Sequence, residues 1–175
     1  MEGLKSLLQQ PVASTVASGA IVFGVQRLVP TTDPNWYKTI RKPNWTPPPF
    51  VFPLMWIPLK TIQSIAAAMV WRQGQGKELL LPLGLFGVHL FLGNWWNVVF
   101  FSQHKMRESV KWMGLFWASI AGTAAAFAPI SQPAAYMMLP TLAWVSVAWK
   151  LNIDIVRVNM ESMDGPEAAK KQHEK

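Results

Sequence analysis

The chain lacks the residues on which several classes of protein chemistry depend. None of its 175 residues is cysteine, which excludes disulfides, thiolate catalysis and cysteine-based zinc sites. Its three histidines fall in an apolar segment, a loop and the tail, so they form no metal constellation. We find no glycine loop for phosphate, no carboxylate pair and no nucleophile–base–acid set. The sequence therefore supports neither an obligatory cofactor nor a dedicated catalytic centre.

Charged residues are also scarce, and the abundance of hydrophobic residues and tryptophan in their place indicates a membrane protein. Charged residues make up 14% of the chain, against roughly a quarter in soluble domains, and 51% of the residues are hydrophobic. The ten tryptophans are a further indication, because tryptophan concentrates where a ring is apolar on one side and wet on the other. The net charge of +7 comes from cations that flank apolar segments. A bilayer surface, not nucleic acid, is the expected partner.

The apolar segments predict an all-α integral membrane protein, a five-transmembrane-helix bundle formed by residues 1–158. The expected spans are residues 6–29, 48–72, 79–101, 109–129 and 133–157. The first is the weakest, since Gln9, Gln10 and Pro11 lie near its start. A cleaved signal peptide is the alternative, but residues 12–29 lack a compact leucine core and continue to spanning length. Residues 159–175 form a polar tail that we expect to be disordered and cytosolic.

The distribution of cations predicts the orientation. Of sixteen lysines and arginines, three lie on the side of the N-terminus and eleven on the side of the first loop, third loop and tail. Two others, Lys60 and Lys150, fall within spans. The positive-inside rule then places the first loop and the C-terminus in the cytosol.

The first loop, residues 30–47, has an unusual composition. Residues 36–48 read WYKTIRKPNWTPP, with two tryptophans, a tyrosine, three cations and three prolines. Flexible linkers are rich in glycine and serine instead, whereas proline fixes φ and extends the residue before it. We expect this loop to form a stiff aromatic lid over the opening of an apolar region of the protein.

This loop resembles the signature of the tryptophan-rich sensory protein/translocator protein family, also known as peripheral benzodiazepine receptors. The similarity continues through Trp56 and Trp71, LPLGLFG at 81–87, Trp96 with the following phenylalanines, and LPTLAW at 139–144, and it covers residues 12–159. It implies a five-helix bundle, often dimeric, that binds tetrapyrroles such as protoporphyrin IX or haem and, in many members, sterols or benzodiazepine-type ligands. It also implies the mitochondrial outer membrane for a eukaryotic chain, and we expect the inner membrane for a bacterial one.

The resemblance places the ligand pocket among the first, second and fifth helices beneath the loop. Transferred by position, the ligand-binding residues are Trp36, Trp45 and Trp56 as aromatic walls, Ala143 and Trp144 on the fifth helix, and Asn152 as a polar contact. Three roles follow: a receptor or carrier in tetrapyrrole sensing, scavenging or transport; light- and oxygen-dependent degradation of bound porphyrin; and lipid or sterol transport. The absence of catalytic machinery favours binding over an enzyme.

Two departures from the family pattern are visible. Asn97 and Val98 stand where members commonly have prolines, so we expect a straighter third helix. In the segment LNIDIVR, Ile153 replaces the tyrosine that sterol recognition in animal members requires, which disfavours sterol binding there.

Ionisable residues inside spans are candidates for function, because a charge in hydrocarbon is costly unless it is paired or hydrated. Lys60 could hold a ligand carboxylate or extend into a wet cavity. His89 is the candidate haem axial ligand, although such a histidine is more often a packing residue. Lys150, Asp154 and Arg157 share one face of the fifth helix and predict a self-neutralising row.

One span carries a helix-packing pattern. Small residues recur every four positions at Gly114, Ala118, Gly122 and Ala126, and they form a smooth groove that lets another helix approach closely. We favour packing within the chain and keep a homodimer seam as the alternative.

Overall fold

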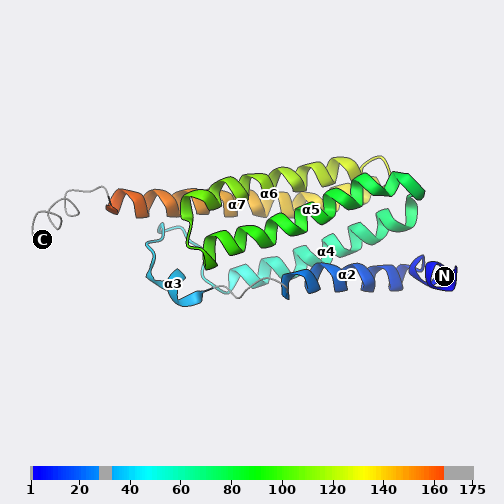
Figure 1. Ribbon diagram of the computed structural model, residues 1–175, viewed down its shortest axis with the longest axis horizontal. Helices are drawn as coiled ribbons and strands as arrows, with labels where there is room; N and C mark the ends of the chain where they lie inside the picture. Colours follow the sequence, from blue (N-terminus) through cyan, green and yellow to red (C-terminus); the bar gives the residue numbers. More distant parts are fainter. Residues whose placement is uncertain (1, 28–32, 164–175) are drawn as a thin grey trace, which may run out of the picture.

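The computed structural model describes residues 2–27 and 33–163, and within these ranges it contains helices and loops but no strand (Figure 1). The elements are α1 Glu2–Leu8, α2 Pro11–Arg27, α3 Pro34–Thr39, α4 Val51–Gln73, the 3₁₀ turn η1 Gly76–Leu79, α5 Leu80–Asn97, the π turn η2 Val98–Ser102, α6 Met106–Phe127 and α7 Gln132–Met163. The all-α prediction is confirmed for this part of the chain. Helix α7 runs into the predicted tail as far as Met163, and residues 164–175 of that tail lie outside the described residues.

The five long helices form an elongated bundle that is closed unevenly. Helix α6 packs extensively against both α5 and α7, and α4 packs against both α2 and α7. Helix α5 makes only sparse contacts with α2 and α4, so the bundle has a thin seam where these three helices meet. Figure 1 shows α3, the α5–α6 connection and the end of α7 together at one end, with the N-terminal end of the described chain at the other.

Two helices of the described residues are long and apolar enough to cross a bilayer. They are α4, at Val51–Gln73, and the continuous segment Gly76–Ser102 that contains α5. Both coincide with predicted spans. The crossing of α2, α6 and α7 stays a prediction.

The first predicted span is interrupted at its polar start. Helix α1 ends at Leu8, and α2 begins at Pro11, where a missing N–H costs nothing in the first helical turn. The Ser14 hydroxyl donates to the Gln10 carbonyl at 2.9 Å and holds the new helix start.

The third span is not a regular helix at the position where its prolines are missing. After Asn97 the chain widens into the π turn Val98–Ser102, which ends with the Gln103 N–H donating to the Val98 carbonyl at 2.8 Å. Such turns insert one residue into a helix and often mark functional sites. The last turn of this helix is thus irregular, and the expectation of a straighter helix stays a prediction.

A short helix inside the loop was not expected from the apolar pattern. Asp33 caps α3, and its carboxylate accepts from the N–H groups of Asn35 and Trp36 at 3.0 and 3.1 Å. Pro34 follows at the first helical position. An aspartate followed by proline is a common helix start, so this signal is present in the sequence.

The small-residue groove of α6 is partly filled from within the chain. A Cβ atom on Gly114 would lie 2.8 Å from a ring carbon of Trp149 on α7, so only glycine lets this indole approach. Further along, Ala118 is exposed, Ala126 is half-buried, and a Cβ atom on Gly122 would meet nothing within 4 Å. Intramolecular packing thus accounts for Gly114, and a second copy over the rest stays a prediction.

We predict that Gly114→Val lowers the free energy of unfolding by about 1–3 kcal/mol, because the added side chain overpacks the contact with Trp149. Gly122→Val adds the same atoms to open space and is the matched control. Denaturation in detergent followed by circular dichroism would measure both. Equal stabilities of the two variants would contradict the assignment of Gly114 to the α6–α7 contact.

Candidate ligand-binding site

Trp45 is tied to the last helix by a polar clasp. Its indole N–H donates to Asp154 Oδ2 at 3.0 Å, the same oxygen that Lys150 contacts at 2.5 Å. The Lys150 ammonium also lies 4.9 Å from the centre of the Trp45 ring, within cation–π range. The predicted self-neutralising pair of Lys150 and Asp154 is present, and the loop tryptophan docks onto it.

A second pair of hydrogen bonds joins the loop to α7. The Arg41 N–H donates to the Asn159 side-chain oxygen at 3.1 Å, and the Asn159 amide donates back to the Arg41 carbonyl at 2.9 Å. Within the loop, Lys42 donates to the Ile40 carbonyl at 3.0 Å and lies 4.7 Å from the Tyr37 ring. Burial raises the pKa of the Tyr37 phenol above its ordinary value. These contacts hold the loop against the end of the bundle.

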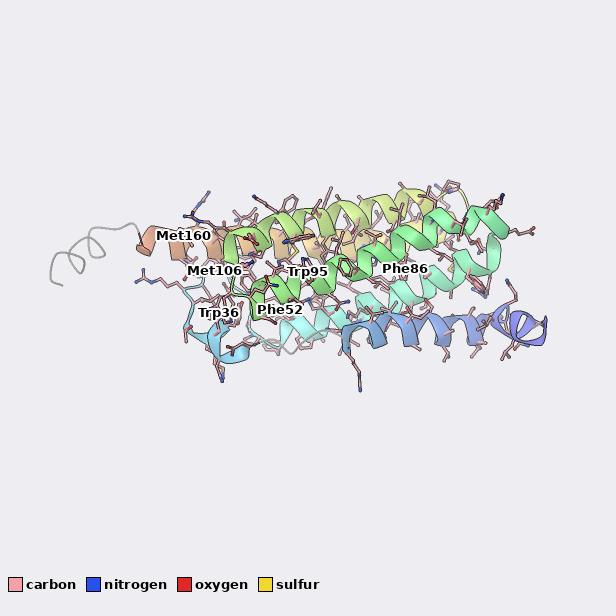
Figure 2. The ribbon with its side chains drawn as sticks, viewed as in Figure 1. Trp36, Phe52, Phe86, Trp95, Met106 and Met160 are labelled. Carbon is pink, nitrogen blue, oxygen red and sulfur yellow. The ribbon has the colours of Figure 1, made fainter. Side chains whose placement is uncertain are left out.

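Trp36 packs into an aromatic cluster at this end. Its ring stacks on His104 at 4.3 Å and meets Phe100 edge-on at 5.3 Å. The buried members beneath it are Phe100, Leu151 and Ile155. Figure 2 places Trp36, Met106 and Met160 at this end of the molecule and Phe86 toward the other. Trp36 thus anchors α3 instead of facing the cavity described next.

A cavity of about 110 Å³ lies inside the seam of α2, α4 and α5. Its aromatic walls are Trp56, Trp96 and Phe116, and we call it the central cavity. Its polar lining consists of Gln26, Lys60, Gln63, His89, Asn94 and Asn97. Polar side chains at a seam between apolar helices are unusual, because unpaired polar groups are costly in hydrocarbon, and Gln26 at the edge of this lining is exposed.

Part of this polar lining is satisfied within the protein. The Asn94 and Asn97 amides donate to the Leu90 and Gly93 carbonyls one turn back, each at 2.8 Å. The Gln63 amide donates to the Thr141 hydroxyl at 2.8 Å and ties α4 to α7. Lys60 donates to the side-chain oxygen of Gln26 on α2.

His89 is buried against two aromatic rings. It stacks parallel on Phe116 at 5.8 Å and meets Phe86 edge-on at 5.1 Å. It is 2% exposed, and its Nδ1 atom has no hydrogen-bond partner among the described residues. The position is compatible with packing and with a ligand contact, so axial ligation of haem stays a prediction.

The fifth-helix residues of the predicted site are distributed over different surroundings. Trp144 meets Trp56 edge-on at 6.5 Å, and its buried indole N–H has no partner in the described structure. Ala143 is exposed. Asn152 is buried, accepts from the Trp96 indole at 3.0 Å and donates to the Ser109 hydroxyl at 3.0 Å. It positions Trp96, which lines the cavity.

The structure thus brings together Trp56, Lys60 and His89 around one cavity, with Trp144 packed behind Trp56. The loop tryptophans lie in separate contacts at the end of the bundle. The residues that sequence reasoning missed are Gln26, Gln63, Asn94, Asn97 and, as a site residue, Trp96. A signal existed for Asn97, because His89, Gly93 and Asn97 recur every four positions along one helix face.

Comparison with known protein families tests the resemblance that the loop signature suggested. The model of the TspO/MBR family matches residues 12–157, which is most of the chain. The chain belongs to the TspO/MBR family. The recognition made from the loop is confirmed, and with it the assignment to a family of membrane proteins.

Relatives within the TspO/MBR family include bacterial and animal proteins. Protein CrtK of Rhodobacter capsulatus is 32% identical over 125 residues, 71% of this chain and 78% of its own. The tryptophan-rich protein TspO of Chlorobaculum tepidum is 33% identical over 141 residues, covering 80% and 89%. The human translocator protein is 30% identical over 148 residues, covering 83% and 87%. The second and third of these are named as a tryptophan-rich protein and a translocator protein, and none of the three names denotes an enzyme.

We predict that Trp45→Phe speeds amide hydrogen exchange in the loop, residues 41–48, several-fold, because the ring remains but the hydrogen bond to Asp154 is lost. Trp45→Ala removes the ring as well and should have the larger effect. Trp71→Phe, at the opposite end of α4, is the control. Unchanged exchange in Trp45→Ala would contradict the clasp.

Proposed function

We propose that this TspO/MBR protein is a membrane receptor or carrier for tetrapyrroles, acting in their sensing, scavenging or transport. Protoporphyrin IX and haem are flat, largely apolar rings with carboxylate arms. Such a ligand needs aromatic surface and a few polar groups within one site. The names of the relatives, translocator and tryptophan-rich sensory protein, are compatible with this role.

The central cavity is the observation that carries the proposal. It combines the tryptophan walls Trp56 and Trp96 with the cation Lys60 and lies below the clasped loop. Its volume of about 110 Å³ is smaller than the roughly 300–1,000 Å³ of typical small-molecule sites. A tetrapyrrole therefore has to extend along the seam, where α5 packs sparsely against α2 and α4.

The sterol alternative has weaker support at the fifth helix. Ile153, which stands in place of the tyrosine, is 39% exposed on the outside of α7. Its surface lies away from the central cavity lining. Sterol binding through this segment is not part of the proposal.

Porphyrin degradation is tested together with binding. Detergent-solubilised protein is titrated with protoporphyrin IX while tryptophan quenching and the Soret band are followed, in the dark and under light. Saturable quenching without a new product supports a receptor. A product formed only in light and oxygen, and lost with the cavity tryptophans, would favour the enzyme role. Absence of saturable quenching would overturn tetrapyrrole binding.

We predict that Trp56→Ala weakens protoporphyrin binding about tenfold, the effect of losing an aromatic contact and its buried area. The control is Trp112→Ala, which removes an indole that packs against Trp95 and does not line the cavity. Equal losses in the two variants would indicate a general change in the bundle and would count against Trp56 as a contact residue.

For haem, we predict that the Soret band of the complex shifts on binding and that His89→Ala abolishes the shift. The buried imidazole has an unpartnered Nδ1 and lines the central cavity. His104→Ala, which changes the loop histidine stacked on Trp36, is the matched control. A shift that survives His89→Ala would exclude His89 as the axial ligand.

A further inference from the structure

The seam of α2, α4 and α5 contains two adjoining spaces of opposite character. The central cavity has many polar side chains in its lining, whereas the neighbouring crevice of about 360 Å³ is lined mainly by apolar side chains of the same three helices and by Leu8 of α1. Leu90 lines both, so the two spaces adjoin at this side chain. Phe86 lines the crevice, and Figure 2 shows it toward the end of the bundle away from the loop.

The central cavity contains one cation, Lys60, and no anion. Among the side chains that line it, only Lys60 and His89 can be charged, and both are bases. The ion pairs of the described residues lie elsewhere and join Asp33 to His104, Glu108 to Lys105 and Asp154 to Lys150. Lys60 has neutral neighbours instead, the Gln26 oxygen and the face of Phe23 at 6.0 Å. A cation inside a span that lacks a counter-ion is a functional site by default.

We propose that Lys60 and Gln26 form a carboxylate-binding site that selects lipophilic carboxylic acids. The carboxylate lies at the Lys60 ammonium in the central cavity, and the apolar body extends along the seam into the crevice. This inference rests on the proposed function to the extent that a tetrapyrrole with propionate arms is one such acid. It goes further by making the acid group, and not the ring alone, the feature that is recognised.

The volumes of the two spaces suit a carboxylate in the central cavity and an apolar body in the crevice. A crevice of about 360 Å³ lies within the range of small-molecule sites, roughly 300–1,000 Å³. The central cavity holds a carboxylate with several waters, since one water needs only about 10–15 Å³ on this measure. The Gln26 amide can donate to the second carboxylate oxygen while Lys60 binds the first. A neutral ester would leave the ammonium without its counter-ion and should bind more weakly.

The test compares acids with their esters. Protoporphyrin IX is paired with its dimethyl ester, and oleic acid with methyl oleate. Wild-type protein, Lys60→Met, Lys60→Arg and the surface control Lys105→Met are titrated in detergent by tryptophan quenching for the porphyrins and by calorimetry for the oleoyl pair. We expect the wild type and Lys105→Met to bind each acid about tenfold more tightly than its ester.

Lys60→Met should remove this preference while ester binding is retained, which also shows that the variant is folded. Lys60→Arg should keep the preference, because the positive charge remains. Equal binding of acid and ester by wild type, or a preference that survives Lys60→Met, would overturn the inference.

The outcomes distinguish a failure of the carboxylate site from a failure of the proposed tetrapyrrole function. Equal binding of protoporphyrin and its ester leaves the tetrapyrrole function standing and removes the carboxylate site. Binding of oleic acid over its ester, without any porphyrin binding, supports the site and removes the tetrapyrrole function. Absence of binding by all four compounds would overturn both.

Discussion

The hydrocarbon of a bilayer offers no hydrogen bonds, and this constraint shapes the interior of the protein. Backbone groups are satisfied inside helices, and polar side chains have to find partners within the bundle. Asn97 returns its amide to its own helix, and Asn152 joins Trp96 to Ser109 across three helices. Lys60 obtains only a neutral partner. The lysine therefore keeps a positive charge that no carboxylate among the described residues neutralises.

The two ends of the seam differ in how firmly they are held. At the loop end, Trp45 and Arg41 bind Asp154 and Asn159 of α7, and Trp36 stacks on His104 in the α5–α6 connection, so that two segments hold the lid. Along the seam, α5 meets α2 and α4 with few contacts, and the crevice reduces them further. Regions with few packed contacts open at the lowest free energy. For the proposed ligand, we therefore expect entry by separation of α5 from α2 and not by lifting of the loop.

Sequence reasoning predicted the elements better than their partners. The apolar runs gave helices α4 and α5 with nearly the observed bounds, and the loop signature gave the family. The loop tryptophans were assigned to the ligand because a stiff aromatic loop requires an explanation. The contact of Trp45 with Asp154 joins residues 109 positions apart, and no spacing rule reveals such a pair. Gln26 likewise reaches the cavity only because α2 packs on α4. The periodicity of apolar residues identifies the buried face of a helix, whereas tertiary packing determines which residues that face contacts.

The π turn at Val98–Ser102 explains how the chain manages without the prolines that the family pattern has there. A proline would bend the helix by removing an N–H, whereas here all N–H groups remain and one residue is inserted into the last turn. The insertion shifts the side chains that follow, and Phe100 reaches the cluster with Trp36 while Trp96 stays on the central cavity. Because Trp96 and Phe100 also stack at 5.5 Å, the cavity wall and the loop anchor form one aromatic unit.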